Sequence, residues 1–159
     1  MTTVRAKIIK GKDKPEFDHK ALDIRRVARV VKGGRRFSLR VVVVVGDRRG
    51  RVGLGTGKAV NVSLAIEKAV RRGKKQLITV SLTKNFSIPY PVQAKFGASK
   101  ILIKPAAEGR GLSAGGSVRA ILELAGIRNA SAKLLSRSKN RLNNAQAALK
   151  ALSLCRFMS

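Results

Sequence analysis

Residues 37–45 form a run that ends in five consecutive valines, and this run constrains the fold more than any other segment. β-Branched side chains favour an extended backbone, because they pack well on a pleated surface and lose rotamer freedom in a helix. The run is too short to cross a bilayer, which takes about 20 apolar residues. We therefore expect residues 37–45 to form a buried strand.

Turn signals on both sides of this strand predict an antiparallel sheet. Residues 32–36 form a basic turn with two glycines, and residues 46–50 form a hairpin signal. Extended patterns lie beyond both turns, at about residues 23–31 and at residues 51–58. Three antiparallel strands are the expected outcome.

A helix is expected next, because apolar residues recur at i, i+3, i+4, i+7 and i+8 from Val62. Asn61 can cap its first turn, and Gly73 is expected to end it. The sheet and this helix form a predicted domain over residues 21–75. Residues 1–20 are rich in lysine and in turn formers, and we expect them to be a flexible basic extension.

Residues 76–155 predict a second domain. Strands are expected at residues 77–82, 92–96, 101–104 and about 129–135, the last with a helical start as the alternative, and helices are expected after Gly116 and at residues 142–152. Residues 156–159 form a short tail. The fold class is therefore α+β, with a three-stranded antiparallel sheet and one helix in the first domain and a four-stranded sheet with two helices in the second.

The charge of the chain indicates a polyanionic partner. There are 35 Lys and Arg residues against 8 Asp and Glu, which gives a net charge of +27 over 159 residues. Residues 1–80 carry 22 basic and 6 acidic groups, and residues 81–159 carry 13 and 2. A folded domain with this charge repels itself unless an anion covers it. Because both halves are basic and no segment can span a membrane, the composition favours a protein embedded in RNA on several faces, with no membrane partner.

The residues do not indicate a catalytic, metal or cofactor site. The single cysteine, Cys155, excludes an internal disulfide and a zinc site with several cysteines, and the single histidine is His19. No histidine or carboxylate is paired with a second group for acid–base or nucleophilic chemistry. Aromatic residues are only 4% of the chain, which argues against base stacking on a sheet. We expect a structural protein that binds RNA by shape and phosphate.

The strongest RNA-binding candidates lie in the basic turn and around it. Residues 25–51 carry ten basic groups and one aspartate. A projecting loop with flexible glycines, arginines and the nearby Phe37 can insert into an RNA groove, although a solvated basic turn is the simpler alternative. The candidate residues in this segment are Arg25, Arg26, Arg29, Lys32, Gly33, Gly34, Arg35, Arg36, Arg48, Arg49 and Arg51.

Residues 51–59 resemble a phosphate-binding glycine loop but fail in detail. A P-loop needs glycine where Val52 stands and Ser or Thr where Ala59 stands, and a dinucleotide fingerprint needs Gly or Ala at Lys58. We interpret the segment as a strand that is bare on one face, so that another backbone, such as RNA phosphate, can approach closely. This adds Gly53, Gly55, Gly57 and Lys58 to the RNA-binding candidates.

Residues 108–119 place free backbone N–H groups at the start of a predicted helix. That geometry favours an anion, which could be an RNA phosphate or a carboxylate of a neighbouring protein. A simple helix entry with no ligand is the alternative. The candidate interface residues are Glu108, Gly109, Arg110, Gly111 and Arg119.

Several segments together indicate a family. They are VVKGGRRFS (30–38), VVGD (44–47), GRVGLGTGKA (50–59), PAAEGRG (105–111) and AGGSVRAILELAG (114–126). In this order and spacing they closely resemble the ribosomal protein S5 family of the bacterial-type small subunit, over about residues 22–155. The resemblance implies a double-stranded-RNA-binding-like first domain and, in the second, the fold named after this family's second domain.

The resemblance also implies a function. Members contact small-subunit rRNA, border small-subunit proteins four and eight, line the mRNA entry side with proteins three and four, and affect decoding accuracy. The turn at residues 27–35 matches the family's rRNA loop near the spectinomycin site, and Gly111 and Arg119 match positions at the boundary with protein four. A free double-stranded-RNA-binding protein or RNA chaperone is the alternative; a small kinase-like or ribonuclease-subunit relative is the enzyme alternative.

Further segments look like cyanobacterial and plastid members, notably residues 73–80, 82–84, 87–89 and 142–145. We therefore expect a ribosome of the chloroplast stroma, with the cytoplasm of a cyanobacterium or another bacterium as the alternative. The chain departs from the usual family pattern at residues 61–63 and 137–141 and at Arg48 and Arg49. The added positive charge suggests extra phosphate contacts or drift.

Overall fold

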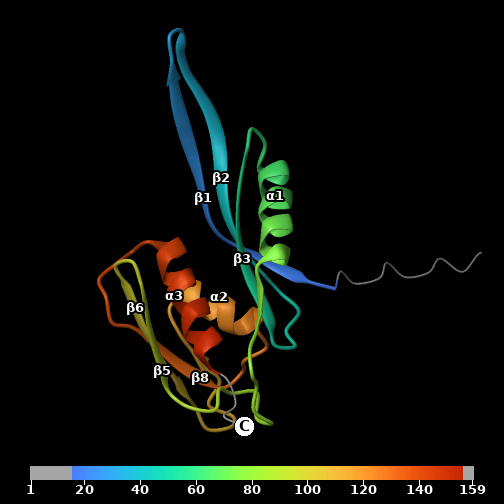
Figure 1. Cartoon of the computed structure of the whole chain (residues 1–159), viewed down its shortest axis with the longest axis vertical. Helices are drawn as coiled ribbons and strands as arrows, with labels where there is room; N and C mark the ends of the chain where they lie inside the picture. The colour runs from blue at the N-terminus through green and yellow to red at the C-terminus, as the bar shows by residue number, and fades with distance from the viewer. Residues whose placement is uncertain (1–15, 156–159) are drawn as a thin grey trace, which may run out of the picture.

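The computed structural model describes residues 16–155, which form two sheets and three helices (Figure 1). The first sheet is antiparallel, in the order β1 (Asp18–Val31), β2 (Gly34–Gly46), β3 (Arg51–Ala59) and β4 (Leu77–Thr79), and α1 (Val62–Lys75) packs on one of its faces. The second sheet has the order β5 (Val92–Phe96), β6 (Ser99–Pro105), β8 (Ala130–Leu134) and β7 (Leu112–Ser113), and it is accompanied by α2 (Gly116–Leu124) and α3 (Arg141–Leu154). The predicted α+β class with two domains is confirmed.

The valine run explains how the layers stack. Val41, Val43 and Val45 pack against Ala65 and Ala69 of α1. Their neighbours Val42 and Val44 point to the other face, where they join the larger core that α2 and α3 form with the second sheet. A strand that is covered on both faces has no polar alternation, which is why the run is uninterrupted. The order of layers is α1, first sheet, α2 with α3, second sheet (Figure 1).

The turn between β2 and β3 holds the two domains together. The N–H groups of Arg48 and Gly50 donate to the carbonyls of Leu124 (2.9 Å) and Ala125 (3.0 Å) at the end of α2. Gly126 has a φ of +88°, and a β-carbon there would lie less than 3.0 Å from the carbonyl of Arg48. The glycine is therefore required twice, by its backbone conformation and by the close approach of the two chains.

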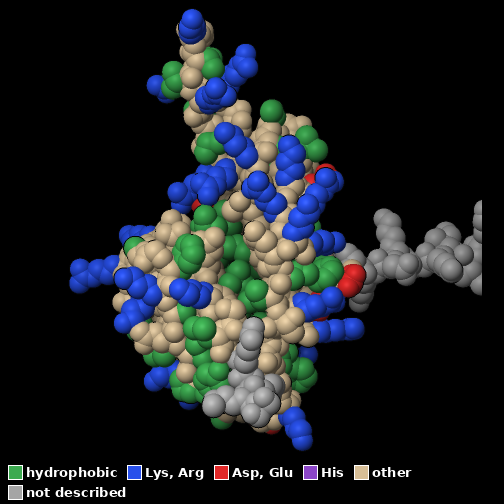
Figure 2. All heavy atoms as spheres, viewed as in Figure 1, with side chains coloured by type: hydrophobic (Ala, Val, Ile, Leu, Met, Phe, Trp, Pro, Cys, Tyr) green, Lys and Arg blue, Asp and Glu red, His purple; other side chains and the backbone are tan. Residues whose placement is uncertain are grey.

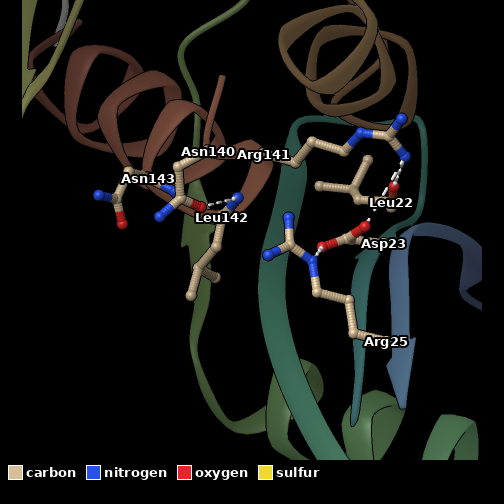
Figure 3. A network of polar contacts seen from close by, with 7 residues as sticks. All are labelled: Leu22, Asp23, Arg25, Asn140, Arg141, Leu142 and Asn143. Carbon is tan, nitrogen blue, oxygen red and sulfur yellow. Dashed lines mark hydrogen bonds and ion pairs between the residues drawn. The ribbon is translucent and has the colours of Figure 1, made fainter. Parts of the chain in front are cut away.

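A second polar seam joins α3 to the base of β1 (Figure 3). β1 has a bulge at residues 21–23, and Nη1 of Arg141 donates to the exposed carbonyl of Leu22 at 2.9 Å. Asp23 lies 3.8 Å from Arg141 and accepts from Nε of Arg25 at 2.6 Å. The side chain of Asn140 caps α3 by accepting from the N–H of Leu142 and of Asn143. Arg141, which we considered for phosphate contact, therefore fastens the bulge to the second domain.

Several expectations about the elements are wrong. Residues 77–79 pair with β3, so the first sheet has four strands, and β7 takes the fourth place in the second sheet. The reason is the one-residue connection at Gln76, which returns the chain directly beside β3. Gly73 does not end α1, because it lies inside the helix and packs against Val45. Asn61 holds the N-cap position of α1 without a side-chain hydrogen bond.

The expected extension is also shorter than its predicted range. Residues 18–20 belong to β1, paired with the end of β2, and residues 1–15 and the tail at 156–159 lie outside the described residues. Through this pairing, β1 runs beside β2 as far as Gly46, the last residue of β2. The predicted strand at about residues 129–135 is confirmed as β8.

Asp47 organises the β2–β3 turn, and its removal should weaken the contacts between this turn and the end of α2. Its side chain is 4% exposed, and it accepts from the N–H of Arg49 (2.8 Å) and Arg51 (3.0 Å) and from Nε of Arg51 (2.6 Å). Burial raises the pKa of this carboxyl, but the hydrogen bonds from Arg51 and from the two N–H groups outweigh it and hold the pKa below the ordinary 3.8. The carboxylate therefore stabilises the fold fully above that ordinary value, and this contribution is lost as pH falls through the lowered pKa.

We predict that Asp47→Asn lowers the free energy of unfolding at neutral pH by about 1–2 kcal/mol, because the guanidinium of Arg51 loses the nearer of its two anionic acceptors, Asp47 and Glu16. Urea denaturation should show that the difference from the parent protein shrinks in acid. Asp18→Asn is the control, because Asp18 is about half exposed in its pair with Arg48 and such pairs contribute little. Equal losses for both variants would contradict the role given to Asp47.

Candidate nucleic-acid interface

The β1–β2 hairpin projects from the body of the molecule (Figure 1). β3 pairs with β2 only from Leu39 to Gly46, so the part of the hairpin beyond Leu39 has no third strand beside it. The predicted residues Arg25, Arg26, Arg29, Lys32, Gly33, Gly34, Arg35 and Arg36 all lie on this hairpin and are exposed. The structure thus brings the larger part of the predicted RNA-binding set together on one projecting element.

The strand register lines up arginines on one face of the hairpin. Arg25 lies directly opposite Arg40, and Arg29 lies directly opposite Arg36. Opposed residues of an antiparallel pair share a face, with β-carbons about 5 Å apart, and like charges in such pairs are destabilising. Lys58 of β3 extends the first pair to a row of three, because it lies opposite Arg40 on the other side. Asp23 already offsets part of the charge of Arg25, at 2.6 Å, whereas Arg29 and Arg36 form no ion pair within residues 16–155. A bound anion between Arg29 and Arg36 would relieve their repulsion.

The opposite face of the hairpin is less charged and more apolar. Val30 is 75% exposed and Phe37 is 45% exposed. The guanidinium carbon of Arg26 lies 3.6 Å from the centroid of the Phe37 ring, so the two side chains form one flat stack. Flat aromatic and guanidinium groups are the surfaces on which unpaired RNA bases stack. This face therefore offers a stacking surface, whereas the arginine face offers positive charge.

The hairpin tip is a two-residue turn of Lys32 and Gly33. Gly34, the first residue of β2, has a φ of +135°, a conformation that side-chain-bearing residues rarely adopt. Lys and Arg side chains gather over the hairpin and over α1 and β3 in Figure 2. The glycines therefore shape a turn whose surroundings are strongly basic.

The predicted residues Arg48, Arg49 and Arg51 do not join this surface. Arg48 and Arg49 lie in the turn at the other end of β2, a strand of 13 residues that spans about 40 Å, and Arg51 is the first residue of β3. Nε of Arg48 is 3.0 Å from Asp18, and Arg51 pairs with Asp47 and with Glu16 at 3.1 Å. Two of these three side chains thus serve the turn and the strands beside it.

The interpretation of Gly53, Gly55 and Gly57 as an RNA-facing stripe is wrong. All three are buried, and a β-carbon at any of them would lie less than 3.0 Å from a backbone carbonyl of α1. A backbone does approach the bare face of β3, but it is the backbone of the following helix. Lys58 is exposed, and its neighbours include basic residues of α1 that the sequence analysis did not select, namely Lys68, Arg71, Arg72 and Lys75.

The predicted partner-interface residues lie at one end of the second domain. Glu108, Gly109 and Arg110 are exposed in the loop between β6 and β7, where Gly109 and Gly111 have φ values of +81° and +75°. The N–H of Gly111 donates to Oδ1 of the buried Asn129 at 3.2 Å, which fixes the end of the loop. Arg119 is exposed on α2 and lines a cleft of about 310 Å³ together with Arg48, Leu112, Glu123, Gly126, Ile127 and Arg128.

The described part of the chain offers no grouping for metal chemistry, since no three His, Cys, Asp or Glu side chains come together within residues 16–155. His19 is exposed on β1. Cys155 is buried, and burial raises the pKa of its thiol, so it stays protonated. No helix between residues 16 and 155 combines the length and apolarity needed to cross a membrane.

Comparison with known proteins identifies the family. Residues 17–81 match the model of "Ribosomal protein S5, N-terminal domain", and residues 94–158 match that of "Ribosomal protein S5, C-terminal domain". The chain is 49% identical over 156 residues to "Small ribosomal subunit protein uS5c" of Cyanophora paradoxa, covering 98% of this chain and 92% of that one. It is 50% identical over 157 residues to "Small ribosomal subunit protein uS5" of Nostoc punctiforme, covering 99% and 87%.

A third relative, "Small ribosomal subunit protein uS5c" of Pyropia yezoensis, is 47% identical over 156 residues, covering 98% of this chain and 89% of that one. These relatives are named as constituents of the ribosome, which confirms the expectation of a structural protein that is not an enzyme. Both domain models of the family match this chain. About half of its positions are identical to those of these relatives over nearly its full length. The chain belongs to the ribosomal protein S5 family, as a structural constituent of the small ribosomal subunit.

Proposed function

We propose that this protein holds small-subunit rRNA mainly through its β1–β2 hairpin. The observation that carries the proposal is the arginine face, where Arg25 opposes Arg40 and Arg29 opposes Arg36. A folded protein gains nothing from such pairs by itself, and phosphate oxygens are the ligands that arginine binds best. The stack of Arg26 on Phe37 supplies a surface for an unpaired base on the opposite face.

We further propose that the loop at residues 108–111 and Arg119 contact small-subunit protein four. Proteins three and eight, and mRNA near its entry, are the other proposed neighbours, and the contacts would support decoding accuracy. The exposed glycine loop and the basic cleft beside Arg119 offer a surface for acidic side chains of a partner. The chloroplast stroma is the proposed compartment, because relatives such as those of Cyanophora and Pyropia are named uS5c.

Sedimentation tests the main proposal. An epitope-tagged copy of the whole chain should travel with small subunits in a sucrose gradient and remain there after a high-salt wash. Binding of the purified protein to an rRNA fragment should weaken with salt, with a log–log slope of several units, because phosphate contacts release counterions. A chain that washes into the light fractions while it still binds RNA would instead be a free RNA chaperone.

Arg119→Leu should raise misreading without loss of rRNA binding. Arg119 lies on α2 and lines its cleft together with Arg48, which is in the turn at the end of β2 opposite to the hairpin tip, and it forms no ion pair within residues 16–155. Loss of its charge should therefore weaken a contact with protein four and leave the fold intact. A reporter for near-cognate misreading should show a several-fold increase in cells whose ribosomes carry the variant.

Lys95→Leu is the matched control for this experiment. Lys95 is exposed on β5, at the edge of the second sheet opposite to β7, and it should leave accuracy unchanged. The result that contradicts the protein contact is unchanged accuracy together with weaker rRNA binding by Arg119→Leu. The loop and cleft would then hold RNA phosphate.

A further inference from the structure

A basic groove lies between α1 and the outer edge of β3. Its lining encloses about 320 Å³ and consists of Thr56, Gly57, Lys58, Lys68, Arg71, Arg72 and Lys75. α1 contains a single acidic residue, Glu67, which is 3.8 Å from Arg71 and largely exposed. Figure 2 shows Lys and Arg side chains gathered over this part of the molecule. The groove therefore has a high density of uncompensated positive charge.

The edge of β3 forms the floor of the groove. β4 pairs with β3 only from Arg51 to Gly53, so residues 54–59 have no strand on that side in the described sheet. A second hollow, of about 510 Å³, shares Thr56, Arg72 and Lys75 with the first and continues to Leu142 and Gln146 of α3. The two hollows together form one path along the open edge, from α1 to the second domain.

We propose that this groove binds the phosphates of an RNA strand, as a contact additional to the hairpin. The proposal rests on the proposed rRNA-binding function and extends it. Lys68, Arg71 and Lys75 follow one face of α1 over about 10 Å, at 1.5 Å per residue. In a B-DNA duplex one strand has one phosphate per about 3.4 Å of helix axis, so on that axial spacing about three phosphates fall within this length. Lys58 connects the groove to the arginine face, because it also lies in the row with Arg40 and Arg25.

The lining favours a phosphate backbone over an acidic peptide strand. A peptide that extends the sheet needs the free carbonyls of the edge, but Nη1 of Arg72 already donates to the carbonyl of Thr56 at 3.3 Å. The first hollow has no large apolar side chain to hold a peptide side chain, and no aromatic ring to stack a base. Binding should therefore depend on phosphate and be tolerant of sequence.

The first test compares two triple variants of equal charge. The groove variant is Lys68→Gln, Arg71→Gln and Lys75→Gln, and the control is Lys95→Gln, Lys100→Gln and Lys133→Gln, all at exposed positions. Fluorescence anisotropy with labelled oligouridylate should show at least tenfold weaker binding for the groove variant than for the control. The slope of log affinity against log salt concentration should be smaller by about two for the groove variant, because each of the three lost phosphate contacts contributes about 0.7.

Equal affinities and equal slopes for the two triple variants would overturn the groove proposal. Loss of binding to oligoglutamate with unchanged binding to oligouridylate would also overturn it, in favour of an acidic protein segment. Failure of the hairpin proposal has a different signature, namely unchanged RNA binding by a variant of Arg29 and Arg36. The two proposals can therefore fail independently.

The second test separates rRNA from mRNA and needs no variant. Lys68 and Lys75 are acylated in the free protein, in assembled small subunits, and in small subunits with oligouridylate as messenger, and mass spectrometry measures the extent. Protection upon assembly assigns the groove to rRNA, and protection only after oligouridylate is added assigns it to the messenger. Equal acylation in all three samples would overturn the proposal.

Discussion

Gly55→Ala is expected to destabilise the protein by about 3 kcal/mol or more. A β-carbon at residue 55 would lie less than 3.0 Å from the carbonyl of Ala69 and 2.6 Å from the N–H nitrogen of Gly73, both in α1. Overpacking a core costs about 1–3 kcal/mol when side chains can move aside, but here the obstacle is helix backbone. α1 must shift away from β3, and that shift also opens the core around Val43 and Val45.

Urea denaturation of the purified protein measures this effect, and Gly33→Ala is its control. Gly33 lies in the hairpin turn, a β-carbon there meets nothing within 4 Å, and its φ is not in the left-handed region. The control should therefore stay within about 0.5 kcal/mol of the parent protein. If Gly55→Ala were equally stable, α1 would not rest on the glycine stripe, and the stripe would again be available to RNA.

The glycine stripe shows what local sequence reasoning can and cannot supply. Alternating glycines correctly predicted that a backbone approaches one face of β3, but not which backbone. The complementary signal lies in α1, where Ala65, Ala69 and Gly73 recur every four residues and so form one smooth line along the helix. Two matching stripes of small residues, one with period two and one with period four, predict a close helix–strand contact that neither predicts alone.

The valine run and the basic hairpin were predictable for different reasons. Five adjacent valines specify a buried strand locally, and the turns beside it specify antiparallel pairing. The arginine face depends on register, because Arg40 becomes part of it only when it stands opposite Arg25. β4 lies within a predicted strand, at residues 77–82, but it was expected in the second sheet, whereas the two residues of β7 carry too little pattern to be predicted at all. Their places in the two sheets follow from the connections and not from their residues.

Arg29→Gln with Arg36→Gln is expected to weaken rRNA binding by roughly 10- to 100-fold and to leave the free protein as stable or slightly more stable. The two side chains stand directly opposite each other, and removal of like-charge repulsion in such a pair is worth about 0.2–1 kcal/mol. If Arg29 and Arg36 only supported the fold, their removal would instead destabilise the free protein. The slope of log affinity against log salt should fall by about one and a half to two, at about 0.7 per phosphate of a single strand or about 0.9 per phosphate of a B-DNA duplex.

Arg49→Gln with Arg137→Gln removes the same charge from two exposed positions outside the hairpin, and it is the matched control. Filter binding to an rRNA fragment over a range of salt concentrations, with urea denaturation of each protein, measures affinity, slope and stability together. If both double variants lost affinity equally, net charge alone would govern binding. A hairpin variant that loses stability and affinity together would assign the arginine pair to the fold. Weaker RNA binding with undiminished stability is the combination that only an anion between Arg29 and Arg36 explains.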